Sequence, residues 1–146
     1  MSLLELAALL AGSMLPVQAG INGRLGRDLA NPVFATFVSF ALGTMALLLY
    51  VAAARQKLPS GSTITNIPWW AWTGGILGAV YVTGVVWITP KIGVAAAMIL
   101  VIVGQIVTSA ALDHFGAFGL TAHPMNMGRM CGIALLIGGV LMVRKF

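Results

Sequence analysis

Long, uninterrupted apolar segments fill most of this 146-residue chain and restrict what it can fold into. The segment from Pro32 to Ala54 is 23 residues long, interrupted only by the small polar side chains of Thr36, Ser39 and Thr44. As an α-helix it would rise about 34 Å, which exceeds a hydrocarbon core about 30 Å thick. A soluble domain of this size has nowhere to bury such a helix. The sequence therefore predicts a protein that spans a membrane.

Composition and charge agree with a membrane location. Hydrophobic residues make up 60% of the chain and charged residues 8%, against about 25% charged in a typical soluble domain. The net charge is +5, but the Lys and Arg residues stand at the ends of apolar segments and form no patch. This pattern indicates retention at the membrane surface and argues against nucleic-acid binding. With one cysteine, Cys131, the chain can form neither an internal disulfide nor a metal site of several thiolates.

Residues that begin and end helices predict an all-α, five-helix membrane bundle in a single domain. Asn31 followed by Pro32 is a helix-start signal, because Asn caps a free N–H and Pro has none to lose. Pro90 disfavours helix at the residue before it, so the third helix should end near Ile88. The N-terminal segment carries Glu5 and no basic run, which favours a retained first helix over a signal peptide. The expected spans are 3–26, 32–54, 68–88, 93–112 and 126–143, with a polar loop at 55–67.

Polar side chains at membrane depth are the candidates for function. Gln18 and Asn22 lie one turn apart in the first helix, directly after Pro16. Pro16 leaves the Gly12 carbonyl without its usual donor, so a kink is expected there. A polar group buried in hydrocarbon without a hydrogen-bond partner costs on the order of several kcal/mol of free energy. These side chains must therefore face protein or a wet cavity.

The fourth helix carries a second polar stripe. Gln105, Ser109 and Asp113 recur every four residues and share one face. Two interpretations remain open for both polar faces. They could be hydrogen-bonding contacts between helices, or they could line a substrate path with Tyr81 or Trp87 as aromatic walls.

The three acidic residues offer limited chemistry for coupling transport to an ion. Asp28 follows Arg24 by four residues, a spacing that favours an ion pair. Glu5 suits the positive end of the first helix, and Asp113 stands beside His114 at the end of the fourth. Glu5 and Asp113 are possible coupling groups, but neither is expected at the membrane centre. The chain shows no nucleophile–base pair, nucleotide-binding fingerprint or metal motif, so neither an enzyme nor a cofactor is expected.

Four segments resemble the YdcZ-like branch of the drug/metabolite transporter superfamily. They are LPVQAGINGRLG (15–26), GVVWITPKIGVAAA (84–97), GQIVTSAALDHFG (104–116) and GIALLIGGVLMV (132–143). The resemblance implies a five-helix exporter of the inner membrane that works as a pair, related to the four-helix small multidrug resistance proteins. Those proteins carry a Glu in the middle of helix 1. Here Glu5 lies at the helix edge and Gln18 lies deeper, so their proton-exchange mechanism does not transfer.

The distribution of basic residues bears on orientation and assembly. With five spans, one side receives Arg24, Arg27, Lys91, Arg144 and Lys145, and the other receives Arg55, Lys57 and Arg129. This bias of five to three is weak under the positive-inside rule and slightly favours an external N-terminus. Two oppositely inserted copies would reproduce the inverted repeat common in transporters.

The expected protein is therefore a small-molecule transporter that pairs with a second copy, or a paralogue, in opposite orientation within the lipid. A passive channel formed by an inverted dimer and a non-transporting subunit that needs a related partner are the alternatives.

Overall fold

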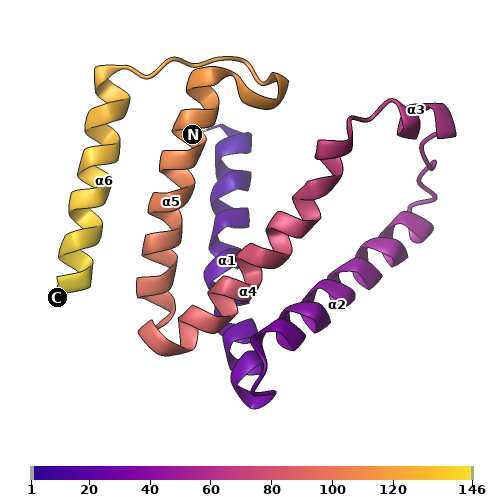
Figure 1. The fold of residues 1–146 in the computed structure, drawn as a ribbon, viewed down its shortest axis with the longest axis horizontal. Coiled ribbons are helices and arrows are strands. Elements are labelled where there is room, and N and C mark those ends of the chain that lie inside the picture. Colours follow the sequence, from indigo (N-terminus) through magenta and orange to yellow (C-terminus); the bar gives the residue numbers. More distant parts are fainter. Residues whose placement is uncertain (1, 146) are drawn as a thin grey trace. The chain divides into compact units, whose positions relative to one another are not determined.

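The computed structural model describes residues 2–145, except for the side chain of Arg144, and this part of the chain is helical with no β-strand. Figure 1 shows the elements in chain order. Their bounds are α1 Leu3–Asp28, α2 Pro32–Ala53, α3 Gly61–Thr65, η1 Trp69–Thr73, α4 Gly74–Ile92, α5 Val94–Phe115, η2 Ala117–Gly119 and α6 Met127–Lys145.

The first two helices begin where their capping residues place them. Ser2 and Glu5 form a capping box at α1, in which each side chain accepts from the other residue's backbone N–H. At α2 the Asn31 side chain accepts from the Phe34 N–H at 3.0 Å, and Pro32 is the first helical residue. The Asn31–Pro32 start signal is confirmed.

The expected end of the third span near Ile88 is wrong, because α4 continues through Pro90 to Ile92. Pro90 removes only the N–H that would reach the Val86 carbonyl, and a helix tolerates one such loss close to its end. The helix stops instead at Gly93, whose φ of 87° is unfavourable for residues with a side chain. The span also starts differently, with the 3₁₀ segment η1 preceding α4.

Two other boundaries differ from the sequence prediction. The polar loop 55–67 contains the short helix α3, capped by the Ser60 side chain on the Thr63 N–H. The fourth span was expected to end at residue 112, whereas α5 continues to Phe115 and includes Asp113 and His114. Its end is set by Gly116, which has the left-handed conformation typical of a helix C-cap.

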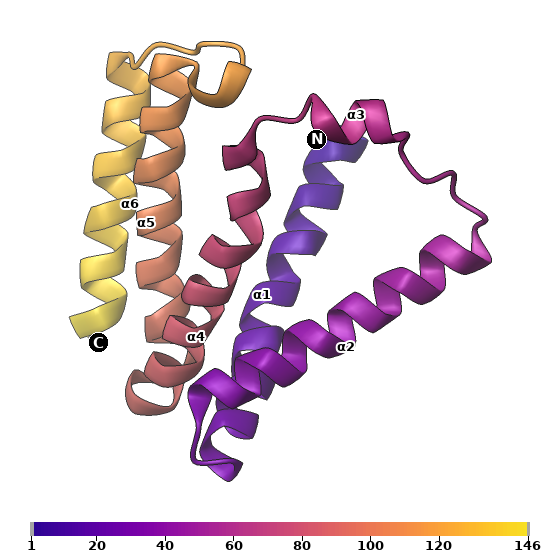
Figure 2. The same ribbon diagram turned by 45° about the vertical axis from the view of Figure 1, so that its right-hand side comes forward.

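The chain divides into two compact units, one through Lys91 and one from Ile92. In the first unit, α1 and α2 are close near their connection and α2 diverges from α1 toward its C-terminal end (Figures 1 and 2). The small core of this unit contains Ala35, Val82 and Val86. Gly26 of α1 lies so close to α4 that a Cβ added there would stand 2.6 Å from Val86 Cγ1. α1 and α2 pack against each other at the end near their connection (Figures 1 and 2).

Two polar contacts connect α1, α2 and α4 within this first unit. Asn22 of α1 donates from Nδ2 to Ser39 Oγ of α2 at 3.1 Å. Thr83 of α4 donates to Thr36 Oγ1 of α2 at 3.2 Å, and Thr36 in turn donates to the Pro32 carbonyl. Asn22 and Thr36 are buried. In an apolar surrounding these hydrogen bonds favour one particular packing of the three helices.

The second unit consists of α5 and α6 with the loop between them. The two helices run antiparallel and lie side by side in both views (Figures 1 and 2). Hydrogen bonds connect this loop to the C-terminal end of α5 and to the first turn of α6. His123 N–H donates to the Asp113 carbonyl at 2.8 Å, Met125 N–H donates to His114 Nδ1 at 2.9 Å, and Arg129 Nη1 donates to the His123 carbonyl at 2.9 Å.

Within the described residues, four segments are long and apolar enough to cross a membrane: Leu3–Asp28, Pro32–Ala53, Trp69–Ile92 and Val94–Phe115. The fifth predicted span corresponds to α6, whose apolar part, Met127–Val143, is shorter. The structure thus supports an all-helical membrane protein with four clear spans. The fifth span, the single-domain organisation and pairing with a second copy stay predictions.

Candidate functional site

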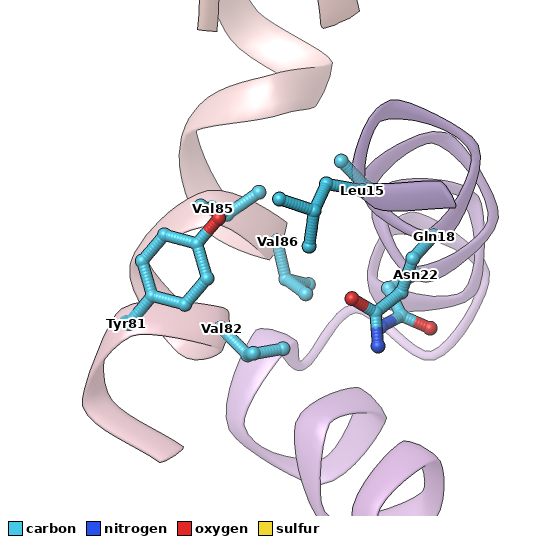
Figure 3. Close-up of a pocket in the computed structure, with 8 residues that line it drawn as sticks. Leu15, Gln18, Asn22, Tyr81, Val82, Val85 and Val86 are labelled. Atoms are coloured by element: carbon cyan, nitrogen blue, oxygen red, sulfur yellow. The ribbon is translucent and has the colours of Figure 1, made fainter. Parts of the chain in front are cut away.

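Gln18, Asn22 and Tyr81 line one small cavity between α1 and α4 of the first unit. Figure 3 shows Leu15, Gln18 and Asn22 of α1 facing Val82, Val85 and Val86 of α4. The cavity volume is about 10 Å³, room for no more than about one water molecule. It is too small for a substrate within one chain.

The two polar residues after Pro16 have different surroundings. Asn22 is 5% exposed and bonded to Ser39, so it is a contact between helices. Gln18 is exposed, and within residues 2–145 its side chain makes no hydrogen bond. Gln18 and Asn22 also border a groove of about 340 Å³ along α1, lined by Ser13, Met14, Val17 and Ile21 as well. Gln18 is therefore an uncharged polar side chain of α1 that is available for another molecule.

The two proposed aromatic walls are separated by the structure. Tyr81 is half-buried at the α1–α4 cavity. Trp87 is 56% exposed and lies outside that cavity, where the Lys91 Nζ stands 3.4 Å from the centre of its ring. Such a cation–π pair is typical of a helix end at the membrane surface.

In the second unit, Ser109 and Asp113 line a groove between α5 and α6, and Gln105 does not. Gln105 is exposed and, among the residues described, has no side-chain hydrogen bond. The groove has a volume of about 380 Å³. Its walls come from two adjacent helices: Ile106, Ser109, Ala110 and Asp113 of α5, and Arg129, Gly132, Ile133 and Leu136 of α6.

One end of this α5–α6 groove carries both charges. Arg129 Nη1 stands 3.7 Å from Asp113 Oδ2, and the two side chains are 38% and 41% exposed. At this exposure and distance the pair contributes little to stability. Sequence reasoning missed Arg129 because only the folded loop brings it opposite Asp113.

Glu5 and Asp28 each have a polar partner in the structure. Glu5 accepts from the Ser2 N–H at 2.8 Å in the capping box and is exposed. Asp28 pairs with Arg24 through two contacts of 2.8 and 2.9 Å, as the sequence predicted. Pro16 lies inside α1 and is half-buried. The ion-coupling roles of Glu5 and Asp113 and the functional kink at Pro16 stay predictions.

Sequence reasoning also missed the close contact between α1 and α4. Among the small residues of α2, Ala35 is fully buried, and at Gly43 an added Cβ would meet nothing within 4 Å. The close approach instead occurs at Gly23 and Gly26. Beside Gly23 lies Thr89, 4% exposed, whose Oγ1 has no hydrogen-bond partner in the described part of the chain. The three-residue spacing of the two glycines was the available signal.

Comparison with known proteins agrees with this architecture. A family profile described as "Putative inner membrane exporter, YdcZ" matches residues 3–142, nearly the whole chain. The chain belongs to the YdcZ family. It is 22% identical over 143 residues to the inner membrane protein YdcZ of Escherichia coli (strain K12), an alignment that covers 97% of this chain and 95% of the relative. No solved structure matches the chain.

Family membership confirms the resemblance drawn from the four sequence segments. Together with the long apolar helices, it places the protein in the inner membrane as a multi-pass protein. The family's description is that of an inner membrane exporter and names no enzymatic activity.

Proposed function

We propose that this protein exports a small polar molecule across the inner membrane, working as a dimer in which both chains contribute polar groups to one cavity. The main supporting observation is the exposed carboxamide of Gln18 in the middle of α1, which has no hydrogen-bond partner within residues 2–145. A carboxamide facing lipid at that depth carries a free-energy cost of several kcal/mol, on the order of an unmade hydrogen bond. A second chain or a hydrated substrate would remove this cost.

The need for a second chain follows from cavity size. Small-molecule sites typically occupy about 300–1,000 Å³, whereas the cavity between α1 and α4 holds about 10 Å³. The groove beside Gln18 reaches about 340 Å³ but is lined by α1 alone. Another chain covering this open face of α1 would enclose a space of suitable size with Gln18 on its wall.

The transport proposal predicts unequal effects of substitutions along α1. In proteoliposomes assayed with a panel of radiolabelled polar solutes, Gln18→Ala should lower saturable flux about tenfold, equivalent to losing about one well-made hydrogen bond. Pro16→Ala should also impair flux, because it restores a donor to the Gly12 carbonyl and redirects the helix that bears Gln18. Leu9→Ala, an exposed apolar position on α1, is the matched control and should transport normally.

The same assay separates the alternatives. Flux that does not saturate and proceeds at channel rates would support a passive pore. No flux from the pure chain, restored by adding a paralogue, would support a subunit role. Normal saturable flux in both Gln18→Ala and Pro16→Ala would mean that the polar face of α1 is only structural.

The weak charge bias predicts dual insertion. C-terminal reporter fusions should show both cytoplasmic and external populations, because five basic residues on one side and three on the other barely favour one orientation. Adding two Lys residues to loop 55–67 should equalise the counts and shift the populations measurably. A C-terminus found on one side only, without a partner of opposite orientation, would contradict an antiparallel homodimer.

A further inference from the structure

The groove between α5 and α6 has the shape of a site for a chain-like molecule. From Asp113 to Ile106 on α5, and from Arg129 to Leu136 on α6, its walls extend seven residues along each helix, or about 10 Å. The volume is about 380 Å³. Beyond Ser109 its lining is apolar, and Ala110 and Gly132 leave it open between the larger side chains.

The charged end of the groove has unused hydrogen-bonding capacity. Arg129 donates one Nη1 bond to the His123 carbonyl, and its contact with Asp113 is 3.7 Å, longer than the usual hydrogen bond of about 2.7–3.2 Å. A guanidinium has five N–H donors, so several remain for an anion. The Asp113 carboxylate accepts no side-chain hydrogen bond within residues 2–145 and can accept from a cationic group. A ligand head with both charges therefore suits this end.

The length of α6 indicates where this charged end lies in the bilayer. α6 has 19 residues, Met127–Lys145, and rises about 28 Å, close to a core about 30 Å thick. Arg129 is the third residue of α6 and must reach the headgroup region to keep its charge hydrated. The groove then extends from the headgroups into the acyl region.

We propose that the α5–α6 groove binds one phospholipid with a zwitterionic headgroup that ends in a primary ammonium. The phosphate lies on Arg129, the ammonium on Asp113, and one acyl chain follows the apolar walls. A lipid with only a phosphate charge would be repelled by Asp113. A quaternary ammonium has no N–H to donate to the carboxylate, so it forms the weaker contact. This site is separate from the polar face of α1 and does not depend on transport.

Native mass spectrometry of the delipidated full-length protein with dioleoyl phosphatidylethanolamine, phosphatidylglycerol or phosphatidylcholine tests the site. The unchanged protein should bind the ethanolamine lipid about tenfold more tightly than the glycerol lipid, as expected for one charge-assisted hydrogen bond. Asp113→Asn should remove this preference, whereas Arg129→Gln should weaken binding of both lipids.

A size test keeps the charges intact. Gly132→Leu places a side chain in the groove, and because a Cβ there meets nothing within 4 Å, the helix can accept it. Binding of every lipid should fall about tenfold, because the leucine side chain displaces one segment of the acyl chain from the apolar walls, and the contacts of that segment with the groove are lost. Gly138→Leu is the matched control, since Gly138 also has open space and does not line the groove. Circular dichroism and gel filtration verify that each variant is folded.

Two outcomes would overturn the proposal. The first is equal binding of the ethanolamine and glycerol lipids by the unchanged protein. The second is unchanged lipid binding in Gly132→Leu. If that variant also loses solute flux in proteoliposomes, the groove is assigned to a transported solute instead. Loss of flux in Gln18→Ala concerns the transport proposal alone.

Discussion

Gly26→Leu should unfold the first unit at a temperature or denaturant concentration well below that of the unchanged protein. A Cβ added at this position would lie 2.6 Å from Val86 Cγ1, and Val86 is 1% exposed. The leucine must push α4 away from α1 or force both side chains out of their rotamers. Overpacking of this kind costs about 1–3 kcal/mol and sometimes more. Unfolding in mixed micelles, followed by circular dichroism, measures the change in stability.

A control on the same helix distinguishes packing from helix propensity. Gly12→Leu adds the same side chain where nothing lies within 4 Å, so it should leave stability unchanged or slightly raise it. A double-mutant cycle adds a further test. Gly26→Ala should be destabilising with Val86 present and much less so in a Val86→Ala background, because the two side chains compete for one volume. Equal stability of Gly26→Leu and Gly12→Leu would contradict the close contact between α1 and α4.

Cysteines at positions 18 and 105 should cross-link between two chains in preference to within one. The expectation comes from depth, with Glu5 and Asp113 taken to mark one membrane surface. At about 1.5 Å per residue, Gln18 lies roughly 20 Å from that surface and Gln105 roughly 12 Å. Inverting a second copy across a core of about 30 Å moves its Gln105 to roughly 18 Å. Within one chain the two depths differ by about 8 Å, and between inverted chains they nearly coincide.

The experiment uses two differently tagged chains, Gln18→Cys and Gln105→Cys, each in a Cys131→Ala background. Co-expression and a short bifunctional maleimide should give a product that carries both tags. Replacing Gln18→Cys by Leu9→Cys is the matched control, because position 9 lies about 12 Å from the inverted position 105 by the same arithmetic. That pair should not react. A single chain that carries both cysteines is treated in the same way. The shared site is rejected if this chain links only internally, or if the two tagged chains form no cross-linked product in a verified dimer.

Local sequence signals determined the helices of this protein. Apolar length predicted five spans, and four of them are long and apolar enough to cross a membrane in the described part of the chain. Asn31–Pro32 begins a helix as predicted, and Gly116 ends one as its chemistry requires. These features depend on residues close together in the chain, so composition and order suffice. The boundary at Pro90 was wrong because a proline near a helix end costs one hydrogen bond, and tertiary packing can outweigh that cost.

Only the tertiary structure decided which polar groups have partners. Gln18 and Asn22 are equivalent in sequence, being amides one turn apart, yet Asn22 reaches Ser39 while Gln18 has no partner among the residues described. Likewise Gln105, Ser109 and Asp113 share a helix face, and the position of α6 selects the last two for the groove. Sequence specifies the face of a helix on which a side chain stands. The neighbour that covers that face, and hence the pairing of each polar group, depends on helix packing between residues distant in the chain.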